Sequence, residues 1–469
     1  MIGDLKPYPE YRDSGLHWLG PMPSHWQTQR SKYLFREADQ RSTTGTEQRL
    51  SMSQRNGLVP SSSVEERRLQ SESNIGAKIC EANDLVLNRL KAHLGVLAVA
   101  PARGVVSPDY TVLRPSGTTN HNYFCAVYRS PVCGQELRLR AKGIVEGFWR
   151  LYTDDFYDIR VPVPPPGEQA AIVRFLTWAN GRLDRAIRAK RKVITLLMEQ
   201  KLTIVRRVVN RGLDASAPLK ASKIDWLGDI PAHWTVWRVS RFAKVGNGST
   251  PSRAQPRYWD RGIYPWLNSS QVNRGYIDHA DQFITPTALR ECHLPRVPAG
   301  SVLVAITGQG KTRGMSAKLG IEATINQHLA YITPRLPVVS TDYLHLALSA
   351  AYPQLRAISD DSGSTKGALT CEDLKRFKLA LPPPDEQAAL VERVRIETSA
   401  ITEAGERLER EIDFLREYRT RLVADVVTGK LDVREAATRL AADMSINHDA
   451  IAGDATDEPE LIDEEATEA

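Results

Sequence analysis

The chain has 469 residues, 42% of them hydrophobic, which is enough for roughly three domains with apolar cores. No apolar run approaches the ~20 residues of a membrane-spanning helix, and the opening residues, MIGDLKPYPEYRDSG, contain no signal-peptide core. The five cysteines are scattered and include no C-x-x-C pair, so we expect a reducing cytoplasm, no disulfides and no zinc site.

The net charge of +6 is unevenly distributed. Residues 442–469 hold ten acidic residues and no Lys or Arg, and we expect the end of the chain, residues 433–469, to be a disordered acidic tail. Without residues 442–469 the remaining chain carries about +16. A body this basic favours a polyanionic partner, nucleic acid first; a basic surface that serves only solubility is the alternative.

The first recognisable segment is a motif that occurs twice. Residues 16–26 read LHWLGPMPSHW and residues 224–234 read IDWLGDIPAHW, so both contain W-L-G-x-x-P-x-H-W, which we call the WLG motif. We expect its tryptophans to pack each motif onto its domain. These are Trp18, Trp26, Trp226 and Trp234.

A variable region follows the first WLG motif and completes a predicted domain, residues 1–166. Polar side chains next to predicted strands suit phosphates and base edges. For each one, an exposed loop position without function is the competing interpretation. The candidates for DNA contact here are Ser51, Ser53, Gln54, Arg55, Asn56, Asn88, Arg89, Lys91 and His93.

The variable region ends at PPPGEQ (164–169), which recurs as PPPDEQ (382–387). From there the two copies align without a gap, at a constant offset of 218 residues, as far as Asp214 and Asp432. Because proline disfavours helix, we predict that long helices start at Gly167 and Asp385, within the segments 167–213 and 385–432. At 1.5 Å per residue, about 43 helical residues span ~65 Å.

Apolar positions within these segments step by threes and fours, as in a heptad seam. The seam residues are Leu183, Ile187, Ile194, Leu197, Ile204 and Val208 in the first copy, and Ile401, Leu408, Ile412, Leu415, Leu422 and Val426 in the second. Such helices are too long for a compact domain of ~150 residues. We therefore expect them to pair antiparallel as a coiled-coil-like rod, the first helix basic and the second more acidic.

The predicted fold class is thus α+β, with a pseudo-twofold internal repeat. Two mixed α/β domains, residues 1–166 and 214–384, would be separated by the rod. In the second domain the same reasoning about polar loops selects Asn247, Ser249, Thr250, Arg253, Asn268, Ser269, Gln271, Asn273, Arg274, Thr307, Gln309, Lys311, Thr312, Arg313, Thr365 and Lys366.

One stretch of the second domain, VLVAITGQGKTRG (302–314), satisfies a relaxed phosphate-binding-loop pattern. A true site needs a helix that starts at Lys311-Thr312, but Gly314 and Gly320 disfavour one. The equivalent loop of the first copy, NRLKAHLG, lacks the pattern. We interpret the stretch as a polar loop for phosphates and base edges. An ATPase or nuclease built on Lys311 is one alternative, and a scaffold protein that does not bind DNA is another.

Together, the repeated motifs resemble those of the specificity (S) subunit of Type I restriction-modification systems. The resemblance spans residues 8–436. It rests on the two WLG motifs, PPPGEQ and PPPDEQ, LVADVVTGKLD (422–432), RLYTDDFYDIRVPVPPP (150–166) and SGSTKGALTCEDLKRFKLALPPP (362–384).

The resemblance implies that each variable region is a target-recognition domain that reads one half of a bipartite site in double-stranded DNA. It implies that the long helices dock two modification subunits, which methylate adenine with S-adenosylmethionine. Restriction subunits would add ATP- and Mg²⁺-dependent translocation and cleavage. This chain would hold no catalytic residue, metal or cofactor of its own, and its sequence contains no N-P-P-Y or D-P-P-Y. The bases read and the length between half-sites do not follow from the sequence.

Overall fold

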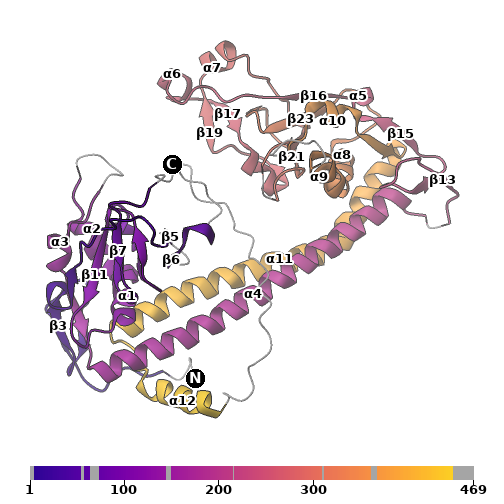
Figure 1. Cartoon of the computed structure of the whole chain (residues 1–469). Helices are drawn as coiled ribbons and strands as arrows, with labels where there is room; N and C mark the ends of the chain where they lie inside the picture. Colours follow the sequence, from indigo (N-terminus) through magenta and orange to yellow (C-terminus); the bar gives the residue numbers. More distant parts are fainter. Residues whose placement is uncertain are drawn as a thin grey trace. The chain divides into compact units, whose positions relative to one another are not determined.

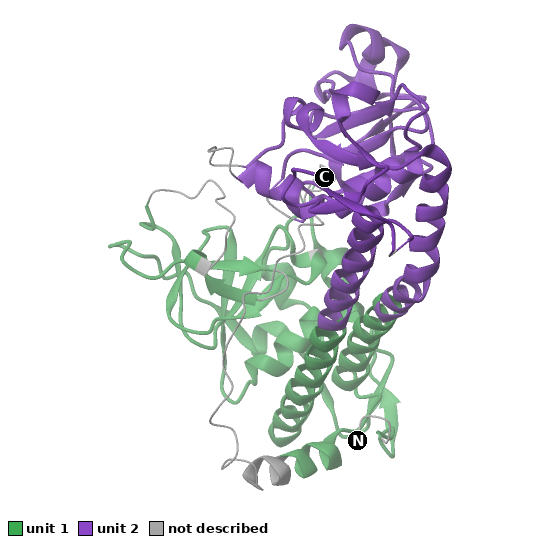
Figure 2. Ribbon diagram, turned by 90° about the vertical axis from the view of Figure 1, so that its right-hand side faces the viewer, with its two compact units in different colours: residues 1–190, 409–458 green, residues 191–408, 459–469 purple. Residues whose placement is uncertain are grey.

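The computed structural model describes residues 5–53, 57–63, 73–143, 149–214, 216–308, 311–360 and 367–446. Two compact units divide the chain (Figure 2): unit 1 comprises residues 1–190 and 409–458, and unit 2 comprises residues 191–408 and 459–469. Two long helices, α4 (Pro166–Arg211) and α11 (Pro384–Val427), contribute residues to both units (Figure 1). The predicted long helices are confirmed.

Both helices begin one residue earlier than predicted, on the third proline of each PPP run. Proline is tolerated at the first helical position because the N–H that it lacks has no intrahelical partner there, and its fixed φ suits the helix. The error in the prediction was to treat all three prolines as outside the helix.

Within each unit, α4 and α11 run antiparallel. Side-chain bonds join Lys190 to Glu411 and Asp184 to Arg419 in unit 1, and Lys201 to Thr402 and Arg207 to Glu397 in unit 2. Along this series of bonds the residue numbers rise in α4 as they fall in α11, which is the order of antiparallel helices. Three of the four bonds join side chains of opposite charge. Every predicted seam residue is buried or half-buried.

Unit 1 contains the α-helices α1 (His121–Arg129), α2 (Pro131–Arg140) and α3 (Thr153–Tyr157), and the 3-10 helices η1 (Ser31–Tyr33), η2 (Ser61–Ser63) and η3 (Ala92–Leu94). Its strands are β1 (Tyr11–Asp13), β2 (Pro21–Pro23), β3 (Gln27–Arg30), β4 (Phe35–Glu37), β5 (Leu50–Ser53), β6 (Gly57–Pro60), β7 (Lys78–Cys80), β8 (Leu85–Asn88), β9 (Leu97–Val99), β10 (Gly104–Val106), β11 (Tyr110–Pro115) and β12 (Arg160–Val163). An antiparallel sheet in the order β4-β11-β8-β9 lies at its centre. Phe35, Phe124 and Tyr128 are buried in its core.

Unit 2 contains α5 (Val239–Phe242), α6 (Pro256–Trp259), α7 (Pro286–Glu291), α8 (Thr341–Ala350), α9 (Tyr352–Asp360), α10 (Cys371–Arg376) and the 3-10 helix η4 (Ser269–Arg274). Its strands are β13 (Leu219–Ala221), β14 (Asp229–Pro231), β15 (Thr235–Arg238), β16 (Ala243–Asn247), β17 (Tyr264–Leu267), β18 (Tyr276–Ile277), β19 (Gln282–Ile284), β20 (Val302–Ala305), β21 (Ser316–Leu319), β22 (Thr324–Ile325), β23 (Leu329–Pro334) and β24 (Lys378–Leu381). The main sheet has the order β16-β23-β20-β21-β18, and a smaller sheet has the order β19-β17-β22. Trp266 is buried in a small separate core.

Residues 434–446, which the sequence analysis assigns to the disordered tail, instead form helix α12 (Arg434–Ile446). Ala437 and Leu440 are buried in the unit 1 core, and the Arg434 guanidinium lies 5.1 Å from the Tyr8 ring centroid. The acidic residues that suggested disorder lie mostly beyond this helix, outside the described residues.

The first turn of α4 carries a buried carboxylate that bonds the first WLG motif. Glu168 accepts hydrogen bonds from Tyr8 Oη at 2.5 Å and Trp26 Nε1 at 3.0 Å, and its other oxygen lies 2.9 Å from His25 Nε2. Burial, and then the bond to Glu168, hold the pKa of Tyr8 well above its ordinary value. A carboxylate is also favoured at this position by the positive end of the helix dipole.

Unit 2 repeats this arrangement at the start of α11. Glu386 accepts from Trp234 Nε1 at 3.0 Å and lies 2.8 Å from His233 Nε2. Trp26 and Trp234 are both fully buried, as predicted for motif tryptophans. The histidine and the second tryptophan of each WLG motif are therefore bonded to the glutamate of the following PPP-x-E-Q motif.

The neighbouring glutamine ties the long helix to the first helix of the domain. Gln169 Nε2 donates to Pro164 O at 2.8 Å, and its Oε1 accepts from the N–H of Asn120, which caps α1. Gln387 likewise donates to Pro382 O at 3.0 Å and accepts from the N–H of Ser340, which caps α8. The Glu-Gln pair thus makes two different tertiary contacts in each unit.

A glycine at the end of the other long helix completes each contact. Gly429, with φ +78°, follows α11, and a Cβ there would lie 2.4 Å from Pro23 in the first WLG motif. Gly212, with φ +73°, follows α4 and lies against Trp234 and Glu386. Helices commonly end at a glycine in this left-handed conformation, and the close approach to the WLG motif is a further reason for glycine at both positions.

We expect Glu168→Ala to destabilise the protein more than Glu386→Ala. The first change leaves two buried donors without an acceptor, at about 1–3 kcal/mol each, so we expect a loss of roughly 2–6 kcal/mol. The Glu386 side chain is 22% exposed against 5% for Glu168, so water can partly replace it. Urea unfolding followed by tryptophan fluorescence measures both, with Glu168→Gln, which keeps one acceptor, as the control. Equal or reversed losses would contradict the assignment.

Candidate nucleic-acid interface

The strand register of unit 2 brings three loops to one end of its main sheet. Asn247 at the end of β16 pairs with Ala330, and Ala305 at the end of β20 pairs with Leu329. The loops that follow β16 and β20 and the turn that precedes β23 therefore lie side by side. The predicted candidates between Asn247 and Arg253 and between Thr307 and Arg313 belong to two of these loops.

Side-chain hydrogen bonds connect these three segments in a chain that we call the polar ridge. Thr250 Oγ1 lies 2.7 Å from Gln327 Oε1, Gln327 Nε2 lies 3.1 Å from His328 Nε2, and His328 Nδ1 lies 2.6 Å from Thr307 Oγ1. Gln327 and His328 are exposed. Thr250 and Thr307 are among the candidates from the sequence, whereas Gln327 and His328 are not, because no local motif marks them.

Arg253 is exposed but held in place. Its guanidinium lies 3.6 Å from the Trp259 ring centroid and 5.2 Å from that of Trp266, and it donates to Gln282 Oε1 at 2.6 Å. A stacked guanidinium loses less conformational entropy when it binds a phosphate or base.

The described residues of the stretch 302–314 form strand β20 and a turn, and strand β21 follows at Ser316. After β20 the chain turns through residues 311–314 and enters β21, so no helix begins at Lys311-Thr312. Lys311 is exposed, and its carbonyl accepts from Tyr352 Oη at 2.7 Å. This is the hairpin-like context expected for a polar loop, and it lacks the helix N-terminus of a phosphate-binding loop.

Arg313, by contrast, is only 5% exposed. Its guanidinium donates to Gly367 O at 2.8 Å and pairs with Asp360 at the end of α9. A Cβ on Gly367 would lie 2.4 Å from that guanidinium. The side chain therefore joins the loop after β20 to the chain that follows α9, a placement that favours a positioning role over direct contact with DNA.

The candidates around η4 are mixed in placement. Asn268 caps η4 through Ser270 N at 3.0 Å. Gln271 is buried and donates to Asp281, which also pairs with Arg274; these bonds, from Gln271 first, hold the Asp281 pKa below its ordinary value. Of the other candidates in unit 2, Asn247 and Asn273 are exposed. Ser249, Ser269 and Thr312 are half-buried.

Unit 1 places its loops in the same way. Asn88 at the end of β8 pairs with Tyr110 at the start of β11, and Arg89 Nε donates across this end to Asp109 O at 2.8 Å. Asn88 is buried and accepts from Leu90 N and Lys91 N, so it shapes the loop. Lys91 is exposed.

Other candidates of unit 1 lie elsewhere or outside the description. Ser51 and Ser53 lie on β5, where Ser51 Oγ is 2.7 Å from Ser61 Oγ. The candidates outside the described residues are Gln54, Arg55, Asn56, Gln309, Thr365 and Lys366, and the side chain of His93 is likewise not described.

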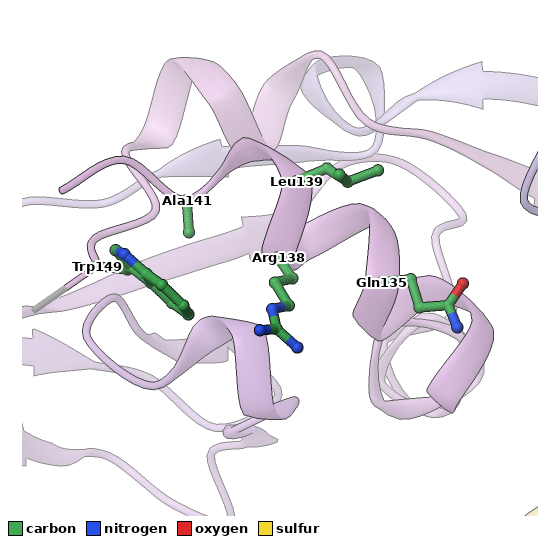
Figure 3. A pocket seen from close by; sticks show the side chains of 5 residues that line it. All are labelled: Gln135, Arg138, Leu139, Ala141 and Trp149. Atoms are coloured by element: carbon green, nitrogen blue, oxygen red, sulfur yellow. The ribbon is translucent and has the colours of Figure 1, made fainter. Parts of the chain in front are cut away.

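A hollow that the sequence does not predict lies beside α2 (Figure 3). Its lining consists of Gln135, Arg138, Leu139, Ala141 and Trp149, and its volume is about 540 Å³. The Arg138 guanidinium lies 5.4 Å from the Trp149 ring centroid.

Among the described residues, no three His, Cys, Asp or Glu side chains lie close enough together to hold a metal ion. None of the described helices is both long and apolar enough to cross a membrane.

Residues 231–408, which lie within unit 2, match the model of the Type I restriction modification DNA specificity domain. The chain is 24% identical over 277 residues to the Type I restriction enzyme EcoR124I/EcoR124II specificity subunit of Escherichia coli, covering 56% of this chain and 62% of that one. It is 30% identical over 164 residues to the Type I restriction enzyme MjaIX specificity subunit of Methanocaldococcus jannaschii, covering 34% and 37%.

The fold resembles that of a chain in a solved structure, with a TM-score of 0.54 and 15% identity. That structure describes the complex assembly and conformational transition of the type I R-M system. The match covers 87% of this chain and 99% of that one. The chain is thus similar, over part of its length, to Type I restriction-modification specificity subunits, and it spans less than two thirds of the length of both curated relatives.

We expect Arg313→Ala to lower the free energy of unfolding by about 1–3 kcal/mol, because it removes a buried charge-assisted bond and leaves Gly367 O without its donor. Lys311→Ala, two residues away on the exposed side of the same loop, should change it by no more than about 0.5 kcal/mol. Urea unfolding of both variants tests this. A neutral Arg313→Ala would mean that the buried bond does not hold the loop.

Proposed function

We propose that the chain is the non-catalytic DNA sequence-specificity subunit of a Type I restriction-modification complex in the cytoplasm, and that each unit reads one half of a bipartite site in double-stranded DNA. One observation carries the proposal: in both units, polar loops from separate chain segments meet at one end of a set of antiparallel strands. Such loops on a rigid scaffold are where base-reading side chains are found.

We further propose that α4 and α11 dock two modification subunits, and restriction subunits through them. Large apolar side chains on these helices are exposed: Val193, Leu196, Met198 and Ile396 in unit 2, and Phe414 and Tyr418 in unit 1. Exposed apolar groups on a helix favour a protein partner. S-adenosylmethionine, ATP and Mg²⁺ would then act in the partner subunits.

The alternative of an ATPase or nuclease built on Lys311 has less support, because the segment after Lys311 turns into β21. Nucleotide binding by the purified chain, lost in Lys311→Ala, would favour that alternative. A scaffold that binds only proteins would show no salt-dependent affinity for DNA, whereas a DNA reader loses affinity as salt rises.

We expect an exchange of residues 31–159 with those of a relative to change one half-site only. This segment lies between β3 and β12, which pair with each other from Arg30–Arg160 to Gln27–Val163, so both cut points keep the strand pair intact. Sequencing of genomic N6-methyladenine in a host that carries the complex reads the result. A change in both half-sites by a folded chimera would contradict two independent readers.

We also expect the long helices to set the distance between half-sites. Four residues inserted between Leu197 and Met198, matched by four between Gly405 and Glu406, keep α4 and α11 opposite each other. The insertion adds ~6 Å and a rotation of roughly 40°. At ~3.4 Å per base pair, the spacer should lengthen by one or two pairs, with some loss of affinity.

Methylation of duplexes whose spacer varies one pair at a time measures the optimum. An active complex with the original optimum would show that these helices do not determine the spacing.

A further inference from the structure

We propose that Gln327 is a specificity-determining residue of unit 2 and that its amide reads an adenine in an A·T pair through the major groove. Thr250 and His328 would position that amide. The proposal rests on the function proposed above and adds to it a residue and the base that it recognises.

Gln327 stands on a fixed turn. The preceding residue, Asn326, is 5% exposed; its N–H donates to Leu267 O at 2.9 Å, and its Oδ1 accepts from His328 N at 3.0 Å. The turn leads directly into β23, whose first residue, Leu329, pairs with Ala305 in the centre of the main sheet. The side chain of Gln327 is thus exposed on a backbone that the sheet holds rigid.

The polar ridge also fixes the amide plane. Thr250 lies at its oxygen and His328 at its nitrogen, at 2.7 and 3.1 Å, and His328 is held in turn by Thr307. These residues come from three separate segments, so the amide is oriented by tertiary structure rather than by its own loop. Such support reduces the conformational entropy lost on binding.

The unused valences of the amide determine what it can read. A glutamine amide has two acceptor lone pairs and two donor hydrogens. The polar ridge uses one acceptor lone pair and one donor hydrogen of the amide. The count is the same if the amide oxygen and nitrogen exchange places, because the Thr250 hydroxyl and the His328 imidazole can each donate or accept. One acceptor and one donor remain.

Adenine matches the acceptor and the donor that remain on the amide. Its major-groove edge presents the N7 acceptor beside the N6 amino donor, and glutamine is a known bidentate partner for it. Guanine presents two acceptors, N7 and O6, so the amide oxygen would face another acceptor. Replacing A·T by G·C at the position read should therefore weaken recognition by about tenfold or more.

The test uses the complete complex with its modification subunits, and duplexes in which each base pair of both half-sites is varied in turn. Gln327→Ala should lose about tenfold of the preference for A·T at one position of one half-site. Thr250→Val, which keeps the shape but removes the hydroxyl, should relax the same position by a smaller factor. Gln327→Glu, which can only accept when ionised, should shift the preference there from adenine toward cytosine, whose N4 amino group donates.

Gln27→Ala is the control, because Gln27 is an exposed glutamine on β3 of unit 1, outside both long helices and away from the polar ridge. It should leave every position unchanged. All variants are compared by thermal unfolding, so that a loss of fold is separated from a loss of selectivity. If Gln327→Ala is unstable, the isosteric Gln327→Glu provides the test of base selectivity.

Unchanged selectivity in folded Gln327 variants would overturn this proposal and leave the proposed function intact. Relaxation at a G·C position would overturn the adenine assignment. A wild-type complex with no sequence preference at all would instead overturn the proposed function.

Discussion

A glutamate in the first turn of each long helix bonds a buried tryptophan, and the rest of each unit is arranged around that contact. Glu168 and Glu386 each satisfy an indole N–H that would otherwise be buried without a partner. The adjacent glutamine bonds the cap of the next domain helix, while the glycine that ends the other long helix fits against the same WLG motif. One local cluster thus joins the WLG motif, the recognition domain and both long helices.

Because the long helices are fixed to the domain at this cluster, the loops at the strand ends of the sheet remain available for recognition. Antiparallel register brings the ends of β16 and β20 beside the start of β23, and the ends of β8 beside the start of β11. Loops at such strand ends can vary in sequence without loss of the core, which the strands and helices form. This separation of scaffold from loops suits a protein that must read different DNA sequences on one fold.

Some of the candidate residues are exposed at the loops, and others are buried and hold their own unit together. Asn88, Gln271 and Arg313 have the chemistry of DNA-contacting residues, but they are buried and bond the backbone or acidic side chains of their own unit. Residue type alone cannot distinguish these uses, because the same donors serve a carbonyl or a base. Gln327 and His328 carried no signal in the sequence, since their partners Thr250 and Thr307 are distant in the chain.

The sequence by itself determined the duplication, the two long helices with their apolar seam, the absence of a helix after Lys311, and the resemblance to Type I specificity subunits. These features depend on local periodicity, proline and glycine, which act within a few residues. It misplaced the helix starts by one residue and assigned α12 to a disordered tail. Only the tertiary structure decided which polar side chains meet, what Glu168 and Glu386 bind, and that Arg313 is buried, because those contacts join segments that strand register and packing bring together from far apart in the chain.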